Sequence, residues 1–507
     1  MTRRMTGAAE AGEELDSALP DASATAGDDA AILDAGVAAL LRGVIAHGVL
    51  PGGDRGGVPG ETRAAWVDLL EELEKIKHTV SAAQARVVVA LDEATRAAEA
   101  AQGIRAERRG RGVASQVGLA MGLSPNAAGS FVGDAGVWVR QMPYTLEALR
   151  RGALSEWRAR TLVRETSHLS PEHRALIDEQ ICGDLRTLAG LGGKRLTARI
   201  KELAARLDVH ACVKRLAKAE GERRVSVRPA PDLMVYLTAL VPMKQGVQAY
   251  AQLAAHAAAA RAAGDERSGG QVMADTLIER VTGRERADDV PVTVNLLVSD
   301  EALLAGGEDP AVLLEGSAAG VGVVPAPVAR ELVAAGVDAD AAWLRAIYVN
   351  PAGRLLATTS TSRFFTRGIT TVLRARQHGI CATPYCDAPM RHADHVRPFG
   401  EGGSTSVGNG QGLCVRCNHA KQAPGWTQRR PDGDTSSRFA VETVTPTGHA
   451  YLSVAPEPPR PAGRAGRDGG SLSCAAPPGA ILRPRRTWAA QRARPGTRRT
   501  RSPRDRS

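Results

Sequence analysis

The sequence predicts a mainly α-helical N-terminal domain, a small α/β connector and a compact cysteine-rich C-terminal module, with disordered segments at both ends. Apolar residues recur at helical spacing from about residue 31 to residue 285, and four of the seven cysteines fall within 37 residues farther along the chain. Aromatic residues make up only 3% of the chain, so a core must be built mainly from Ala, Leu and Val. Such a composition favours helices over sheets.

Composition and periodicity divide the 507 residues into six segments. The expected segments are a disordered lead at 1–30, the helical domain at 31–289, the connector at 290–365, the cysteine-rich module at 366–430, a short extension at 431–455 and a disordered arginine-rich tail at 456–507. The lead is acidic and aperiodic and the tail consists largely of Pro, Gly and Arg, so neither has enough apolar residues to form a core.

The helical domain has apolar residues at positions i, i+3, i+4 and i+7 in nearly every segment. The expected helices are Ala31–His47, Thr62–Gln102, Leu146–His168, Pro171–Leu188, Arg195–Ala219 and Met243–Ala263. Ser124-Pro125 and Ser170-Pro171 each indicate an N-cap followed by proline at the first helical position. A helical scaffold without chemistry of its own is the favoured interpretation of this domain.

The segment Val113–Val132 suggests a helix-turn-helix. Gly118 would permit a close helix contact, and Gly122 would supply a turn residue with positive φ. The second helix would offer only Asn126 and Ser130 to base edges. A buried helical hairpin is therefore favoured, with DNA contact as the alternative.

The connector is predicted to contain strands. Pro291–Val298 shows partial alternation, and Ile347–Val349 and Leu355–Ala357 flank the turn sequence Asn-Pro-Ala-Gly as expected of a hairpin. We therefore expect a small mixed α/β region.

The net charge of +10 is concentrated in the C-terminal tail. Residues 460–507 contain 13 arginines against Asp468 and Asp505, whereas residues 1–459 hold 52 basic and 53 acidic side chains. The positive charge is therefore no indication that the folded part binds a polyanion. The tail either binds DNA electrostatically or is an extension without function, and the second interpretation is favoured.

The first residues contain no apolar segment of a secretory signal, and no run of about 18 apolar residues could span a bilayer. We therefore expect a cytoplasmic protein with no membrane partner. In a reducing compartment, clustered cysteines indicate a metal site rather than disulfides.

Four cysteines form two close pairs, Cys381-x4-Cys386 and Cys414-x2-Cys417. Structural zinc is held tetrahedrally by four thiolates, and two short loops of this kind can each donate two. The loops are rich in Gly, Pro and Asp and are poorly suited to bury four free thiols. We therefore expect a structural Zn²⁺ that helps this segment to fold.

The residues between and after the cysteine pairs carry a second pattern. Asp394-His395 is followed by a glycine-rich stretch, then Asn409, and finally Asn418-His419-Ala-Lys421. Over residues 374–426 this order and spacing resemble the HNH endonuclease family. The resemblance implies a ββα-metal (His-Me finger) fold, in which a two-stranded hairpin is joined to one helix, and hydrolysis of DNA.

Phosphodiester hydrolysis needs a base that deprotonates water and a cation that neutralises charge on the phosphate. His395 is the candidate general base, because imidazole accepts a proton near neutrality. Asp394 is the candidate metal ligand, although neighbouring strand residues face opposite sides and the strand end must twist to bring its carboxylate to the ion. Asn409 matches the family's middle Asn, which implies that it holds the hairpin loop and orients His395.

The last family position is usually His and is Asn418 here, so the chain resembles the HNN variant. Oxygen ligands from Asp394 and Asn418 suit Mg²⁺ or Mn²⁺ as the catalytic ion better than zinc. His419 would replace Asn418 only if the helix register moved by one residue, so Asn418 is preferred. Lys421 shares a helix face with Asn418 and is expected to contact a phosphate.

Other basic residues surround the motif. Arg374, Arg376 and Arg397 are expected to contact the nucleic-acid backbone, with Arg391 adding to the basic rim. His392 and His395 form an H-x-x-H pair, but residues three apart on a strand face opposite sides. A joint metal site is therefore disfavoured.

The N-terminal region is also similar to a known family. The segments GALSEWRARTLVRET (152–166) and GDERSGGQVMADTLIERV (264–281), followed by the C-terminal module, resemble domain of unknown function 222. This resemblance supports the order of domains and adds no mechanism.

The predicted function is a metal-dependent DNA endonuclease in which His395 activates water. The alternative is a zinc-stabilised DNA-binding protein with a decayed nuclease site, for which the departure at Asn418 leaves room. The same chemistry on RNA or on a particular nucleic-acid structure is a third interpretation. One active site per chain would need a homodimer, or two visits, to break both strands.

Overall fold

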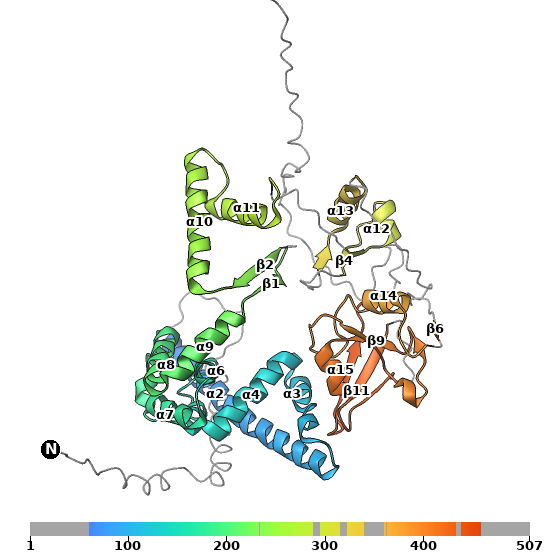
Figure 1. Ribbon diagram of the computed structural model, residues 1–507. Helices are drawn as coiled ribbons and strands as arrows, with labels where there is room; N and C mark the ends of the chain where they lie inside the picture. Colours follow the sequence, from blue (N-terminus) through green and yellow to red (C-terminus); the bar gives the residue numbers. More distant parts are fainter. Residues whose placement is uncertain are drawn as a thin grey trace, which may run out of the picture. The chain divides into compact units, whose positions relative to one another are not determined.

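The computed structural model describes residues 60–232, 234–286, 295–314, 322–338, 359–360, 362–431 and 438–457. Several predictions from sequence lie outside the described residues: the helix Ala31–His47, the hairpin at 347–357, the first half (291–294) of the strand Pro291–Val298, the lead, and the tail beyond Glu457. Figure 1 shows the described elements in chain order.

The N-terminal region is mainly helical, which confirms the predicted fold class (Figure 1). Its elements are α2 (Gly60–Ala101), η1 (Ala106–Arg108), α3 (Val113–Met121), α4 (Pro125–Gln141), α5 (Pro143–Arg150), α6 (Glu156–Thr166), α7 (Pro171–Cys182), η2 (Leu185–Leu188), α8 (Gly193–Leu207), α9 (Val209–Gly221), β1 (Arg224–Pro229), β2 (Val235–Leu240), α10 (Met243–Ala262) and α11 (Gly269–Thr282). Trp138, Met142, Leu162 and Ile177 are fully buried in its core. The indole Nε1 of Trp138 donates a hydrogen bond to the carbonyl of Ala159 over 3.3 Å, so even the largest core side chain is satisfied.

Three predicted helices are each broken in the structure. Leu146–His168 is interrupted at Gly152, whose φ is +70°, between α5 and α6. The predicted helix Pro171–Leu188 ends its α-helical part at Cys182. The predicted helix Arg195–Ala219 breaks at Asp208, whose side chain caps α9 by accepting a hydrogen bond from the amide of Ala211 over 2.8 Å. Helical spacing of apolar residues persists across these breaks, so periodicity alone did not reveal them.

Helix ends with clear capping chemistry agree with the prediction. The side chains of Ser124 and Ser170 accept from the amides of Ala127 and His173, and proline follows each serine. Helices α2 and α10 also begin and end within two residues of the predicted bounds.

A two-stranded hairpin that the sequence analysis did not predict lies within the mainly helical region, at residues 224–240. Strands β1 and β2 pair antiparallel there, with Arg224 opposite Leu240 and Pro229 opposite Val235. The alternation in Arg-Val-Ser-Val-Arg is the signal that a period-two search would have found.

The segment Val113–Val132 folds as a packed helical hairpin. Gly122 ends α3 with φ of +65°, and a Cβ atom on Gly118 would lie 2.9 Å from the carbonyl oxygen of Leu123. Helix α4 buries Ala128 and Phe131. These contacts agree with the favoured interpretation, a buried hairpin.

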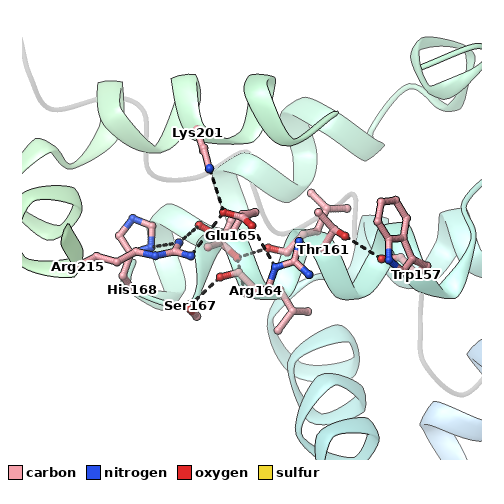
Figure 2. Close-up of polar contacts among 11 residues, drawn as sticks. Trp157, Thr161, Arg164, Glu165, Ser167, His168, Lys201 and Arg215 are labelled. Atoms are coloured by element: carbon pink, nitrogen blue, oxygen red, sulfur yellow. Dashed lines mark hydrogen bonds and ion pairs between the residues drawn. The ribbon is translucent and has the colours of Figure 1, made fainter. Parts of the chain in front are cut away.

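A buried carboxylate joins three helices of this region. Glu165 of α6 lies against Arg164, Lys201 of α8 and Arg215 of α9, with N···O distances of 3.1, 3.9 and 3.5 Å (Figure 2). His168 lies beside Arg215: Nδ1 of the imidazole is 3.0 Å from Nη1 of the guanidinium group. The cations compensate the cost of burying Glu165, so this cluster is structural.

The connector contains β3 (Leu296–Leu297), α12 (Asp300–Leu304), β4 (Ala311–Leu313), β5 (Gly322–Val324) and α13 (Ala326–Asp338). The three strands form one antiparallel sheet in the order β3-β4-β5. Ala311, Val324 and Ala329 are fully buried in a small core of their own. Helices and strands therefore both occur here, as expected.

The C-terminal module contains β6 (Thr359–Ser360), α14 (Arg367–Arg376), β7 (His392–His395), η4 (Phe399–Glu401), β8 (Thr405–Ser406), β9 (Gly410–Leu413), α15 (Val415–Lys421), β10 (Thr427–Arg429), β11 (Ala440–Val444) and β12 (Ala450–Val454). Its sheets are β6-β8, β7-β9 and β10-β11-β12. Ile369, Leu373, Met390 and Val407 form a core between α14 and the strands. Throughout the described part of the chain, helices long and apolar enough to cross a membrane are absent.

We predict that Asp178→Ala strongly destabilises the helical domain. The fully buried carboxylate of Asp178 accepts from the amides of Tyr144 and Thr145, each over 2.8 Å, at the start of α5. Its removal leaves two buried donors without an acceptor, so the free energy of unfolding should fall by about 2–4 kcal/mol in urea denaturation. Asp184→Ala removes an exposed cap that water can replace, and should cost less than about 1 kcal/mol. Equal losses for both variants would contradict this account.

Candidate active site and metal centre

Four cysteine sulfur atoms converge in the C-terminal module. The Sγ atoms of Cys381, Cys386, Cys414 and Cys417 all lie within 4.8 Å of one another, and those of Cys386 and Cys414 are 3.8 Å apart. A tetrahedral zinc ion with Zn–S bonds of about 2.3 Å needs sulfur atoms about 3.8 Å apart. All four residues are buried, so the set fits the structural zinc ion that the sequence predicts.

Local structure explains how the sulfur atoms meet. Cys414 directly follows β9 and caps α15, because its Sγ accepts from the amide of Cys417 over 3.4 Å. Cys381 follows α14 through two residues with positive φ, His378 at +51° and Gly379 at +77°. The cluster therefore ties together the ends of α14, β9 and α15.

Strands β7 and β9 form the hairpin that carries the predicted catalytic residues. His395 pairs with Gly410, and Asp394 pairs with Gln411. A Cβ atom on Gly410 would lie 2.8 Å from Leu373 of α14, so glycine is needed for the helix to approach this face. Side chains alternate between the two faces of a sheet along a strand, and paired residues on neighbouring strands lie on the same face. His395 therefore faces α14, as Gly410 does, while Asp394 faces α15.

His395 lies in a mostly apolar pocket, and only 8% of its surface is exposed. The ring centroids of Phe365 and Phe399 are 4.5 and 5.8 Å from that of the imidazole. Its Nε2 lies 2.9 Å from the hydroxyl of Thr405. Burial lowers the pKa of His395. The negative charge of Asp394 raises this pKa, and the positive charges of Lys421 and Arg363 lower it further. The neutral imidazole therefore predominates at pH 7, as a general base requires.

Asn409 joins the two ends of the loop between β7 and β9. Its Oδ1 accepts from the amide of Arg397 over 2.9 Å, and its Nδ2 donates to the carbonyls of Arg397 and Ser404 over 3.0 and 2.9 Å. Its backbone carbonyl accepts from the amide of Val396 over 2.7 Å, directly after His395. Asn409 thus holds the loop through its side chain and reaches His395 only through the backbone.

Asp394 already has a cationic partner. The ammonium group of Lys421 lies 2.5 Å from Oδ2 of Asp394 and also donates to the backbone carbonyl of His395. Both side chains are largely shielded from water: 25% of the Asp394 side chain and 11% of the Lys421 side chain are exposed. Carboxylate and carbonyl oxygens therefore face one cation-binding position between β7 and α15.

Asn418 and His392 lie together on the same side of β7 as Asp394. The Nδ2 of Asn418 is 2.8 Å from Nδ1 of His392, and its buried Oδ1 has no hydrogen-bond partner among the described residues. An amide oxygen in this state suits a hard divalent cation. The neighbouring His419 is exposed, which agrees with the preference for Asn418.

The three arginines expected to contact nucleic acid differ in their surroundings. Arg397 is exposed and Arg374 is partly buried on α14. Arg376 donates to the carbonyls of Val407 and Gly410 over 2.8 and 2.6 Å, and its guanidinium lies 3.4 Å from the ring centroid of Phe439. Because these contacts engage Arg376 within the module, we reassign it to support of the β8–β9 turn.

Sequence reasoning missed several residues of the site. Thr405, Phe365 and Arg363 surround His395 but lie in segments without a motif. The contact between His392 and Asn418 was also missed, because His392 was considered only together with His395. The signal was available: His392 and Asp394 are two residues apart, so they share a strand face.

Comparisons with known proteins agree with this geometry. The family model "Domain of unknown function (DUF222)" matches residues 67–377, and the model "HNH endonuclease" matches residues 380–423. No curated protein and no solved structure matches the chain.

We predict that the purified chain contains about one zinc ion per molecule and that Cys381→Ser removes it, because three thiolates hold the ion less tightly. Zinc content by elemental mass spectrometry and thermal unfolding would both report the loss. Cys212→Ser changes a cysteine outside the cluster and should leave the zinc content unchanged. Retention of zinc and of thermal stability in the Cys381 variant would contradict the site.

Proposed function

Because the chain belongs to the DUF222 family and carries an HNH endonuclease domain, we propose that it is a metal-dependent endonuclease that hydrolyses DNA. The observation that carries the proposal is the arrangement of β7, β9 and α15, with the buried His395 on one face of β7 and, on the other, Asp394 beside Asn418, whose Oδ1 has no hydrogen-bond partner among the described residues. The sequence motif and the match to the nuclease family support the same interpretation.

Asp394 and Asn418 are the residues that would hold a catalytic Mg²⁺ or Mn²⁺. Oxygen atoms are the preferred ligands of both ions, and Oδ1 of Asn418 has no hydrogen-bond partner among the described residues. When bound, such an ion neutralises charge on the phosphate and on the leaving oxygen.

His395 would take the proton of the attacking water at Nδ1. Thr405 donates its hydroxyl proton to the carbonyl of Arg363 over 3.5 Å, which leaves its oxygen to accept from Nε2 of His395. The Nε2–H tautomer keeps a lone pair on Nδ1. The aromatic walls of Phe365 and Phe399 hold the ring and restrict water around it.

DNA is the substrate that the nuclease family implies. We assign backbone contacts to Arg374 and Arg397, and we add Arg363, which is exposed and close enough to His395 to affect its pKa. Lys421 would contact a phosphate only by exchanging its contacts with Asp394 and the carbonyl of His395. Arg376 is left out of this set because of its internal contacts. A homodimer would allow one binding event to cut both strands.

The alternative, a DNA-binding protein with a decayed site, is less well supported. A decayed site would be expected to lose the base, its hydroxyl partner or the oxygen ligands. His395, Thr405, Asp394 and Asn418 are all present, and Asn418 still offers an oxygen.

We predict that the full chain nicks supercoiled plasmid DNA with Mg²⁺ or Mn²⁺, and that His395→Ala lowers the rate about 10²–10⁴-fold, the usual contribution of a general base. The control is His419→Ala, which removes an exposed histidine of α15 and should leave the rate unchanged. Gel electrophoresis of nicked and linear products measures both. DNA that binds the chain but stays intact with every divalent ion would favour the decayed-site alternative.

We predict that the nicking rate at saturating Mg²⁺ rises with pH to a plateau, with a midpoint below about pH 6.5, the ordinary pKa of histidine. Burial lowers the pKa of His395, so its neutral form is complete at a lower pH than for an exposed histidine. Initial rates between pH 5 and pH 8 would test this. A midpoint well above pH 6.5 would argue against His395 as the base.

A further inference from the structure

The contact between Asn418 and His392 determines which end of the Asn418 amide points away from the histidine. Nδ2 of Asn418 lies 2.8 Å from Nδ1 of His392. An amide nitrogen can only donate, so Nδ1 of His392 must accept, and the neutral ring carries its proton on Nε2. The amide oxygen of Asn418 then points away from His392, where it is buried and has no partner among the described residues.

This orientation matters because the two ends of an amide differ in chemistry. The oxygen is a good ligand of Mg²⁺ or Mn²⁺, whereas the NH₂ group would present hydrogen atoms to the ion. A free asparagine side chain can turn about χ2 and present either end. A ligand carboxylate needs no such control, since both of its ends are oxygen.

The secondary structure places the two contacts side by side. Asn418 and Lys421 are three residues apart on α15, and His392 and Asp394 are two residues apart on β7. Asn418 contacts His392 while Lys421 contacts Asp394, so the helix and strand meet in two adjacent pairs. Their spacing of about 5–7 Å along the elements puts Asn418 next to the Asp394 position.

We propose that His392 is a positioning residue that holds the amide of Asn418 with its oxygen toward the divalent ion. The inference rests on the proposed function, in which Asp394 and Asn418 bind that ion. His392 acts through Asn418, because its Nδ1 lone pair is already engaged by the amide.

Binding of Mn²⁺ alone to the full, zinc-loaded chain provides the test, with the dissociation constant measured by electron paramagnetic resonance. His392→Leu removes the acceptor and should weaken Mn²⁺ binding about 10–100-fold, as loss of a supporting residue usually does. His392→Asn places an oxygen close to the Nδ1 position and should restore the affinity to within about threefold, whereas His392→Gln places its oxygen near the Nε2 position and should not.

The decisive comparison uses Asn418→Asp, because a carboxylate presents oxygen in either orientation. In that background His392→Leu should change Mn²⁺ affinity by less than about threefold, so the two positions should be strongly non-additive. An equal loss in both backgrounds would identify His392 as a direct ligand and overturn the proposal. So would an unchanged affinity for His392→Leu in the Asn418 background.

Further measurements separate this proposal from a folding defect and from failure of the proposed function. Zinc content and thermal unfolding should be unchanged in every His392 variant, and His419→Leu should bind Mn²⁺ normally. If Asp394→Ala binds Mn²⁺ as tightly as the parent chain, the metal site itself is wrong and both proposals fall. If Asp394→Ala and Asn418→Ala weaken binding but His392→Leu does not, only the positioning role is wrong.

Discussion

Convergence of four cysteine side chains is the constraint on which the C-terminal module depends. The cluster fixes the end of α14, the end of β9 and the start of α15 at one point, although Cys386 and Cys414 are separated by 27 residues. Asn418 comes directly after Cys417, so the same constraint sets the rotation of α15 and decides which helix residues face β7. A module with short strands and little apolar core could hardly fix that rotation by packing alone. The cysteine cluster therefore sets the position of the helix that carries Asn418, the proposed ligand of the catalytic ion.

The second organising feature is the division of labour between the two faces of β7. His395 faces α14 and lies among aromatic side chains, where burial favours its neutral form. Asp394 and His392 face α15, where polar side chains and a lysine gather. Alternation along one strand thus separates the mostly apolar surroundings of the proposed base, His395, from the polar surroundings of the proposed cation ligand, Asp394. Glycine at position 410 is part of this arrangement, since a Cβ atom there would lie 2.8 Å from Leu373 of α14 and from Phe365, which packs on the histidine.

Much of this organisation could be predicted from the sequence, because the strongest signals are local. The cysteine pairs and the serine caps each depend on residues close together in the chain, and the structure has both as expected. The breaks at Gly152 and Asp208 were missed because the periodicity of buried residues continues across them. The partners of His395 were missed for a different reason: Thr405 and Phe365 reach it through tertiary folding and follow no fixed spacing. Arg376 illustrates the limit for charged residues, since only the fold shows that its guanidinium supports a turn.

The ion pair between Lys421 and Asp394 has a consequence for assembly. A carboxylate shielded from water and left without a counterion would oppose folding, but the lysine supplies the counterion from within the chain. This side of β7 can therefore form before any divalent ion arrives, in contrast to the cysteine cluster, where the thiolates need their metal. Maturation of the module would then follow an order, with one metal required to build the scaffold and a second recruited only afterwards to an already folded and electrically neutral position.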